Sequence, residues 1–122
     1  MILVDTTVWI DHLRKGASAL SAALEREEVM THPFVIGELA CGSLENRREL
    51  LELLAALPSA VVATGEEALH LIEQHRLMGR GIGWVDVHLL ASVKLTEAAQ
   101  LWTRDKRLHA VATELRIDFH ER

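Results

Sequence analysis

The chain has few of the residues and segments that cross-link a polypeptide, anchor it in a membrane or interrupt its secondary structure. It contains a single cysteine, Cys41, so it cannot form an internal disulfide and is not expected to be a secreted domain stabilised by disulfides. No apolar run reaches the ~18 residues that a membrane span requires, and Asp5 interrupts any signal-peptide core. It has only two prolines and shows no linker, repeat or low-complexity tract. These absences predict a single domain over residues 1–122, working in the cytoplasm.

The charge balance excludes one broad class of function. The chain carries 18 acidic and 13 basic residues, for a net charge of −5, which argues against a protein that coats nucleic acid through bulk electrostatics. It does not argue against a local nucleic-acid site, because a few acids gathered in one place would account for most of the excess negative charge.

Short apolar segments alternate with longer helical patterns. We expect strands at residues 2–4, 29–32, 60–63, 100–103 and 117–120. Between them, leucines at positions 50, 53, 54 and 57 and apolar residues at 108, 111, 112 and 115 repeat with helical spacing. Such alternation predicts an α/β fold, a three-layer α/β/α sandwich around a mainly parallel sheet of about five strands.

Further local signals mark the ends of the helices. Pro33 suits a first-turn position, the run Gly65-Glu66-Glu67 opens a helix, and Gly42 and Gly79 lie near helix ends. The "GRGIG" run at residues 79–83 lacks the Lys-Ser/Thr of a phosphate-binding loop, so we interpret it as a helix-terminating loop.

Four acids map to one edge of this predicted sheet. Asp5 ends the first strand, and Asp105 follows the strand in "LWTRDKR". Glu38 follows the second strand in "HPFVIGELACG", on the side of Phe34, Val35 and Cys41, and Asp86 begins the helix in "GIGWVDVHLLASVKL". Ligands of open parallel sheets bind outside the carboxyl ends of the strands, where these acids are expected.

Each acid also has a structural interpretation. Asp5 and Asp105 could be helix N-caps, and Asp86 could be a first-turn carboxylate that the helix dipole favours. Glu38 stands among apolar residues, where an ion pair is the alternative. The agreement of all four in position favours a shared site.

Four neighbouring carboxylates repel one another, by about 1 kcal/mol per pair at 4 Å in water and by more at lower dielectric. A cation must therefore hold them ionised. Oxygen ligands without a cysteine or histidine cluster suit Mg²⁺ or Mn²⁺. Such a centre can activate water for attack on a phosphodiester.

The runs "VDTTVWIDHLR", "GELACG", "DVHLLASVKL" and "LWTRDKRL" together resemble a PIN domain, specifically the VapC-type toxin ribonucleases of toxin-antitoxin pairs. The resemblance covers essentially the whole chain. It implies an endoribonuclease that uses Mg²⁺ or Mn²⁺, with Asp5, Glu38, Asp86 and Asp105 as catalytic, metal-binding acids. It also implies that Thr7 and Thr103 orient carboxylates, although each could be an ordinary capping threonine.

Other residues receive weaker assignments. His88 and Ser92 depart from the more apolar helix that is usual in this family, and we interpret His88 as a structural histidine rather than a group beside the metal. The seven histidines show no zinc-ligand spacing, so none is assigned as a ligand. Cys41 is expected to be a buried small hydrophobe, and the tryptophans at 9, 84 and 102 to pack in the core. Four cations are candidates for RNA phosphates: Arg80, Arg104, Lys106 and Arg107.

The resemblance further implies partners: an RNA substrate, a VapB-type antitoxin and, as is usual in the family, a second copy of the chain. We expect an apolar groove between the helices of residues 34–44 and 45–57 to receive the antitoxin segment. Two other functions stay open. One is a catalytically silent interaction module with the same fold. The other is aspartyl phosphotransfer, which the threonine at position 7 disfavours, because dehalogenase-like phosphatases carry a second aspartate there.

Overall fold

A small parallel sheet lies at the centre of the computed structural model, which describes residues 1–121 of the chain. Strand β1 (Ile2–Val4) lies between β2 (Val29–Met30) and β3 (Gln100–Trp102), and both pairings are parallel. Leu3 of the central strand pairs with Met30 on one side and with Leu101 on the other. All three strands therefore end at the same edge.

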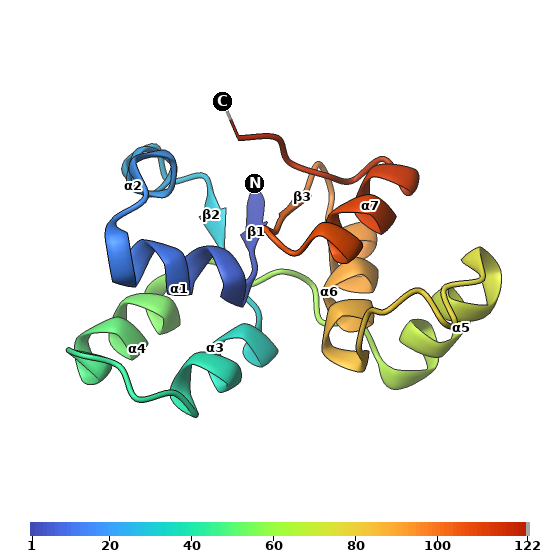
Figure 1. Cartoon of the computed structure of the whole chain (residues 1–122), viewed down its shortest axis with the longest axis horizontal. Helices are drawn as coiled ribbons and strands as arrows, with labels where there is room; N and C mark the ends of the chain where they lie inside the picture. The colour runs from blue at the N-terminus through green and yellow to red at the C-terminus, as the bar shows by residue number, and fades with distance from the viewer. Residues whose placement is uncertain (122) are drawn as a thin grey trace.

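Seven helices surround this sheet in the described part of the chain. They are α1 (Thr6–Lys15), α2 (Ser18–Glu25), α3 (Pro33–Ala40), α4 (Arg47–Ala56), α5 (Gly65–His75), α6 (Trp84–Leu95) and α7 (Lys106–Glu114). In Figure 1, α1 to α4 lie on one side of the sheet and α5 to α7 on the other. Within residues 1–121, no helix combines the length and apolar character needed to cross a bilayer.

The α/β architecture and the parallel sheet are confirmed, but the prediction of about five strands is wrong. Between residues 1 and 121 the sheet has three strands. The segment 117–120 contributes one isolated bridge, Leu101 with Asp118, and the other isolated bridge, Thr31 with Ser59, lies just before the segment 60–63. Ala60 donates to the backbone of Thr31 just after β2, but the backbone N–H groups of Val61 and Ala63 donate to the side chains of Thr96, the C-cap of α6, and of Ser92 within α6. With these donors used in this way, the 60–63 segment does not continue as a ladder.

The two predicted leucine-rich stripes are buried in part. Leu50 and Leu54 of α4 and Leu108 and Val111 of α7 are buried, whereas Leu53 is exposed. Trp9 and Trp102 pack in the core as expected, and Trp84 is half exposed at the start of α6. Position 53 lies off the face that α4 turns toward the core, so the i, i+3, i+4 pattern overestimated the width of the buried stripe.

The predicted helix starts are confirmed where local chemistry marks them. Pro33 occupies the first turn of α3, and Gly65 begins α5 behind a capping box formed by Thr64 and Glu67. Cys41, expected in the interior, is instead exposed, because α3 ends at Ala40 and Cys41 lies beyond its buried face.

Candidate active site

Asp5 lies at the carboxyl end of β1 and is 4% exposed. Its Oδ1 atom accepts hydrogen bonds from the backbone N–H of Thr7 (3.0 Å) and Val8 (3.4 Å) and from the Thr7 hydroxyl. Its Oδ2 atom accepts from the Thr103 hydroxyl at 2.6 Å. Asp5 is thus the N-cap of α1, as the structural interpretation proposed, and its second oxygen reaches across to the segment that follows β3.

Burial has the largest effect on the pKa of Asp5. Desolvation raises the pKa of this carboxyl group above its ordinary value, and the hydrogen bonds from Thr103, Thr7 and Val8 oppose the rise. Since burial penalises the charged form, an ionised Asp5 gains from any positive charge brought nearby.

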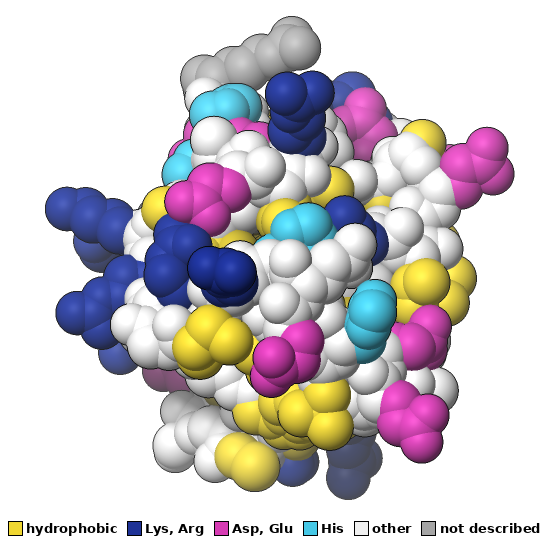
Figure 2. Space-filling view, turned by 90° about the vertical axis from the view of Figure 1, so that its right-hand side faces the viewer, with side chains coloured by type: hydrophobic (Ala, Val, Ile, Leu, Met, Phe, Trp, Pro, Cys, Tyr) yellow, Lys and Arg dark blue, Asp and Glu magenta, His cyan; other side chains and the backbone are white. Residues whose placement is uncertain are grey.

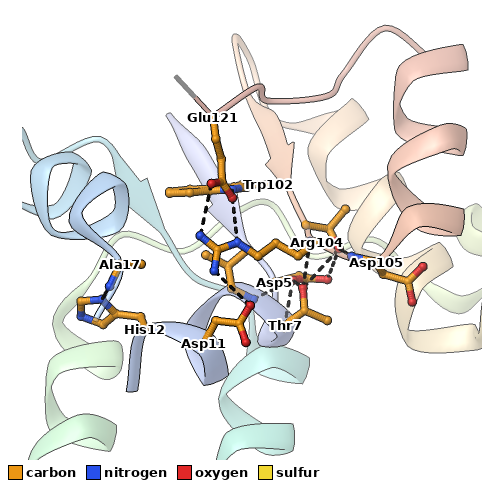
Figure 3. A network of polar contacts seen from close by, with 11 residues as sticks. Asp5, Thr7, Asp11, His12, Ala17, Trp102, Arg104, Asp105 and Glu121 are labelled. Atoms are coloured by element: carbon orange, nitrogen blue, oxygen red, sulfur yellow. Dashed lines mark hydrogen bonds and ion pairs between the residues drawn. The ribbon is translucent and has the colours of Figure 1, made fainter. Parts of the chain in front are cut away.

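Thr103 links Asp5 to a second acid. Its hydroxyl donates to Asp5 and accepts from the backbone N–H of Asp105 at 3.1 Å. Asp105 in turn caps α7, where its Oδ1 accepts from the backbone N–H of Arg107 and Leu108. Figure 3 shows the exposed Asp105 carboxylate at the start of α7, turned away from Asp5. The Asp5 carboxylate and the Asp105 backbone therefore lie at the same edge of the sheet and bond to the same hydroxyl.

Asp86 stands in the first turn of α6 and is half-buried. Its Oδ2 accepts from the backbone N–H of Gly83 at 3.1 Å. Burial raises the pKa of Asp86, and the negative charges of Asp105 and Glu38 raise it further, against the hydrogen bond from Gly83. Asp105 and Glu38 are therefore each within electrostatic reach of Asp86.

Glu38 differs from its expected setting. It is exposed, and its Oε1 atom accepts from the Thr6 hydroxyl of α1 at 2.7 Å. The apolar surroundings predicted for it are absent, because α3 buries Val35 and Leu39, and Glu38 lies on its open side. No ion pair occupies its carboxylate within the described residues.

The four acids form an open arrangement. In the part of the chain that the structure describes, no three of them bring their ligand oxygens within 4.8 Å of one another. Three of their oxygens accept no hydrogen bond from residues 1–121, namely Oδ1 of Asp86, Oδ2 of Asp105 and Oε2 of Glu38. A cation that retains several of its waters, as Mg²⁺ does, needs only one or two direct carboxylate ligands from the protein.

The cations predicted to contact RNA have different surroundings. Arg104 pairs with Glu121 and Asp11 (Figure 3), and these pairs raise its pKa. Arg80 forms a two-bonded pair with Glu114. Lys106 and Arg107 are exposed in the first turn of α7. Figure 2 shows Lys and Arg side chains gathered along the left-hand margin of the face that carries α5, α6 and α7.

Arg107 lies against the backbone of the loop before α6. A Cβ atom added to Gly81 would lie 2.7 Å from Arg107 Cδ, and the φ angle of Gly81 is +81°, a conformation that other residues rarely adopt. A glycine at this position allows the arginine to lie directly on the loop.

The sequence did not reveal a buried polar group beside this edge. His32, which follows β2, is fully buried, and its Nδ1 accepts from the backbone N–H of Phe34 as the N-cap of α3. Because Nδ1 accepts, the neutral ring carries its proton on Nε2, which lies 3.1 Å from the Ser92 hydroxyl. Burial, with a contribution from His88, lowers the pKa of His32 to about 4.

The His32 contacts explain the unusual residues of α6. Ser92 also accepts from the backbone N–H of Ala63 at 3.1 Å, and His88 is buried between the rings of Phe34 and Trp84. His88 therefore packs in the interior, as expected of a structural histidine. The pairing of His32 with Ser92 had no sequence signal, because the two residues are 60 positions apart.

Comparison with known proteins matches this chain to one family. The family model described as "PIN domain" matches residues 2–114. Two curated relatives, both named Ribonuclease VapC32, come from the CDC 1551 / Oshkosh and ATCC 25618 / H37Rv strains of Mycobacterium tuberculosis. Each is 52% identical over 114 residues, which cover 93% of this chain and 92% of the relative.

Proposed function

The chain belongs to the PIN domain family, and we propose that it is a metal-dependent endoribonuclease, the toxin component of a toxin-antitoxin pair. In this proposal Asp5, Glu38, Asp86 and Asp105 are the metal-binding and catalytic acids. The name of the curated relatives supports a ribonuclease, and the arrangement of the acids supports the chemistry.

One observation supports the proposal: acids from four distant segments lie toward one edge of the sheet. The Thr103 hydroxyl donates to the Asp5 carboxylate and accepts from the backbone N–H of Asp105, and the charges of Glu38 and Asp105 both raise the pKa of Asp86. Folding brings these like charges together at a cost, and the structure supplies no arginine or lysine paired with any of the four within residues 1–121. A divalent cation would offset that cost.

The donor set fits Mg²⁺ or Mn²⁺. Every donor is a carboxylate oxygen, and three oxygens have no hydrogen-bond donor among the described residues. When bound, such an ion lowers the pKa of a coordinated water and stabilises the charge on the leaving oxygen.

The surrounding residues have positioning roles in this proposal. The Thr7 and Thr103 hydroxyls hold both oxygens of Asp5 in place, and the Thr6 hydroxyl holds Glu38. Lys106 and Arg107 contact phosphates of the RNA strand, and so do Arg80 and Arg104 where their pairs with acids open. Phosphate contacts of this kind orient a strand without reading its bases.

Cleavage of RNA by the purified protein tests the proposal. We expect activity that depends on added Mg²⁺ or Mn²⁺ and that Asp5→Asn abolishes. Asparagine is also a good N-cap, so this variant keeps the cap of α1 while losing the charge. A variant as active as the wild-type protein would refute the assigned chemistry, and absence of Mn²⁺ binding in calorimetry would favour a catalytically silent module.

We propose a VapB-type antitoxin as the protein partner, bound at an apolar cavity near the predicted groove. A cavity of about 740 Å³ lies between α1 and the loop that joins α3 to α4, and it includes Ile10, Leu13, Leu44 and Leu50. The cavity lies beside the groove expected between α3 and α4: its lining comes from α1, the loop after α3 and the start of α4, and not from α3 itself. An amphipathic segment could bury apolar side chains there and bring a basic residue to the acids.

Binding of the antitoxin encoded beside this gene tests the cavity. Leu13 is 40% exposed, so Leu13→Glu introduces a charge into the cavity without disturbing the core. We expect this variant to bind the antitoxin at least about tenfold more weakly. Leu69→Glu on α5, at a leucine that is 56% exposed, is the matched control. Equal loss in both variants, or in neither, would contradict this location.

We also propose that the protein forms a homodimer. Exposed apolar residues near the end of α6, among them Val61, Val62 and Leu95, could supply contact area. Sedimentation equilibrium would test this proposal, and a monomer at all concentrations would refute it.

A further inference from the structure

A second group of potential metal ligands lies away from the four acids. His109, Asp118 and His120 each offer a ligand atom, and these atoms all lie within 4.8 Å of one another. Among the described residues, this is the one group of three or more histidine, cysteine, aspartate or glutamate side chains that meets this spacing. Local sequence spacing does not join these three residues, because His109 belongs to α7 whereas Asp118 and His120 belong to the C-terminal segment.

Backbone pairing fixes the C-terminal half of this group. Leu101 of β3 donates to Ile117 and accepts from Phe119, at 2.7 and 2.9 Å. The segment therefore runs as an extended chain along β3. In such a chain alternate side chains point to opposite sides, and the ring of Phe119 packs on Trp102 at 4.8 Å. Asp118 and His120 consequently share the other side.

The third residue comes from α7. The rings of His109 and His120 lie 5.5 Å apart at an angle of 77°. The Oδ2 atom of Asp118 is shielded from solvent and pairs with Nε2 of His120 at 2.5 Å. Histidine side chains with acidic atoms beside them are visible near the top of the face in Figure 2. Imidazole nitrogens and a carboxylate oxygen gathered in this way are ligands of the kind that Zn²⁺ binds.

We propose that His109, Asp118 and His120 form a binding site for a transition-metal cation of the Zn²⁺ class. Two imidazole nitrogens and one carboxylate oxygen suit Zn²⁺ and its neighbours in the first transition row, whereas Mg²⁺ selects oxygen ligands alone. Three protein ligands leave coordination positions open for water. The site is separate from the proposed nuclease centre and does not depend on that assignment.

Occupancy of the site would join the C-terminal segment to α7. The next residue, Glu121, accepts from Trp102 Nε1 at 2.7 Å and from Arg104 Nε at 2.8 Å. A cation at residues 118 and 120 would therefore hold Glu121 in position beside Arg104. The expected role of the metal is structural, since binding to the folded chain alone stabilises the fold.

Titration of the full-length chain with ZnCl₂, followed by calorimetry, tests the proposal. We expect one tight site that an excess of MgCl₂ does not displace. His120 is 74% exposed as a side chain, so His120→Ala leaves the core intact. This variant should bind Zn²⁺ more than roughly tenfold more weakly, since even changes around metal ligands cost about 10–100-fold. His70→Ala, an exposed histidine of α5, is the matched control and should bind like the wild-type protein.

Two further measurements separate this site from the acids. Asp5→Asn should leave Zn²⁺ binding unchanged, so failure of the nuclease proposal and failure of this one give different results. Replacing Zn²⁺ by Co²⁺ should give a visible absorption band of imidazole-bound cobalt that His109→Ala and His120→Ala both lose. Absence of Zn²⁺ binding in the wild-type chain, or unchanged binding in His120→Ala, would overturn the proposal.

Discussion

Two buried polar groups at the same edge of the sheet have different surroundings. Asp5 follows β1 and His32 follows β2, and each caps the helix that comes next. Burial raises the pKa of Asp5 and lowers that of His32, so in both cases it favours the neutral form. They differ in their neighbours: His32 faces Ser92 in a closed interior, whereas Asp5 adjoins exposed acids that repel one another.

This difference teaches how to separate polar residues that serve the fold from those that serve chemistry. At His32 every polar atom of the ring has a partner, and the group is neutral. At the acidic edge charge accumulates and several oxygens have no donor among the described residues. Substitutions at the acidic edge should therefore change activity and leave stability intact, and substitutions near His32 should do the reverse.

The largest expected effect is that of Asp86→Asn. Asparagine can still accept the hydrogen bond from Gly83, but it removes a charge that Asp105 and Glu38 repel. We expect Mn²⁺-supported RNA cleavage to fall by roughly 100-fold or more. Thermal unfolding in metal-free buffer should show equal or higher stability. A marked loss of stability would show that Asp86 serves the fold and would break the comparison.

Acid titration of stability should reveal His32. Its folded pKa of about 4 lies below the ordinary value of 6.5, so the unfolded chain binds the proton more readily. The stabilisation is present above pH 6.5 and is lost as the pH falls toward 4, by about 2–3 kcal/mol. Urea unfolding at a series of pH values measures this slope.

Two variants sharpen that measurement. His32→Asn should keep an acceptor for the N-cap and lose the slope between pH 6.5 and 4. Asp5 contributes with the opposite sign, because its raised pKa gives stability below the ordinary value of 3.8 that is lost as the pH rises through the folded pKa. Asp5→Asn should therefore show a steeper gain of stability with pH. An unchanged slope in His32→Asn would mean that another group titrates.

Ser92→Ala should destabilise the closed interior. The substitution leaves His32 Nε2 and the backbone N–H of Ala63 without an acceptor. We expect the free energy of unfolding to fall by about 2 kcal/mol, with nuclease activity per folded molecule preserved. Chemical denaturation followed by circular dichroism measures the first quantity and RNA cleavage the second. A loss of activity without a loss of stability would place Ser92 in the active site.

The smallest effect is expected for Thr6→Val. It removes the hydroxyl that holds Glu38, at an exposed position where water can replace it. Mn²⁺ affinity should fall about threefold, as for the loss of one modest hydrogen bond, and stability should stay the same. Calorimetric titration with MnCl₂ would detect it, and a loss as large as that of Asp86→Asn would mean that Thr6 contacts the metal directly.

The sequence predicted much of this fold because its signals are local. Strand β1, the first turn of α3 at Pro33 and the start of α5 at Gly65 follow from adjacent residues. The same holds for the alternation of helices with strands β1, β2 and β3, and Asp5 and Asp105 follow β1 and β3. Thr103 was assigned through the family resemblance, and its hydroxyl lies between Asp5 and Asp105.

What the sequence missed depends on contacts between distant segments. The 60–63 run resembles a strand, but its N–H groups bond to Thr96 and Ser92 of a helix. Glu38 lies on the open side of α3, which its apolar sequence neighbours concealed. Asp118 and His120 were not assigned as ligands from the sequence, because their third partner, His109, lies in another element. Local patterns do not specify which face of a helix is covered.

The contact between Gly81 and Arg107 has a genetic consequence. Gly81 has no side chain to bind an ion or a substrate. Any larger residue there would displace the Arg107 side chain and would have to adopt the left-handed backbone conformation that Gly81 already has. A selection for cells that survive overproduction of this protein should therefore recover changes at codon 81 alongside those at the acids. Such survivors would carry an intact set of carboxylates and a displaced arginine.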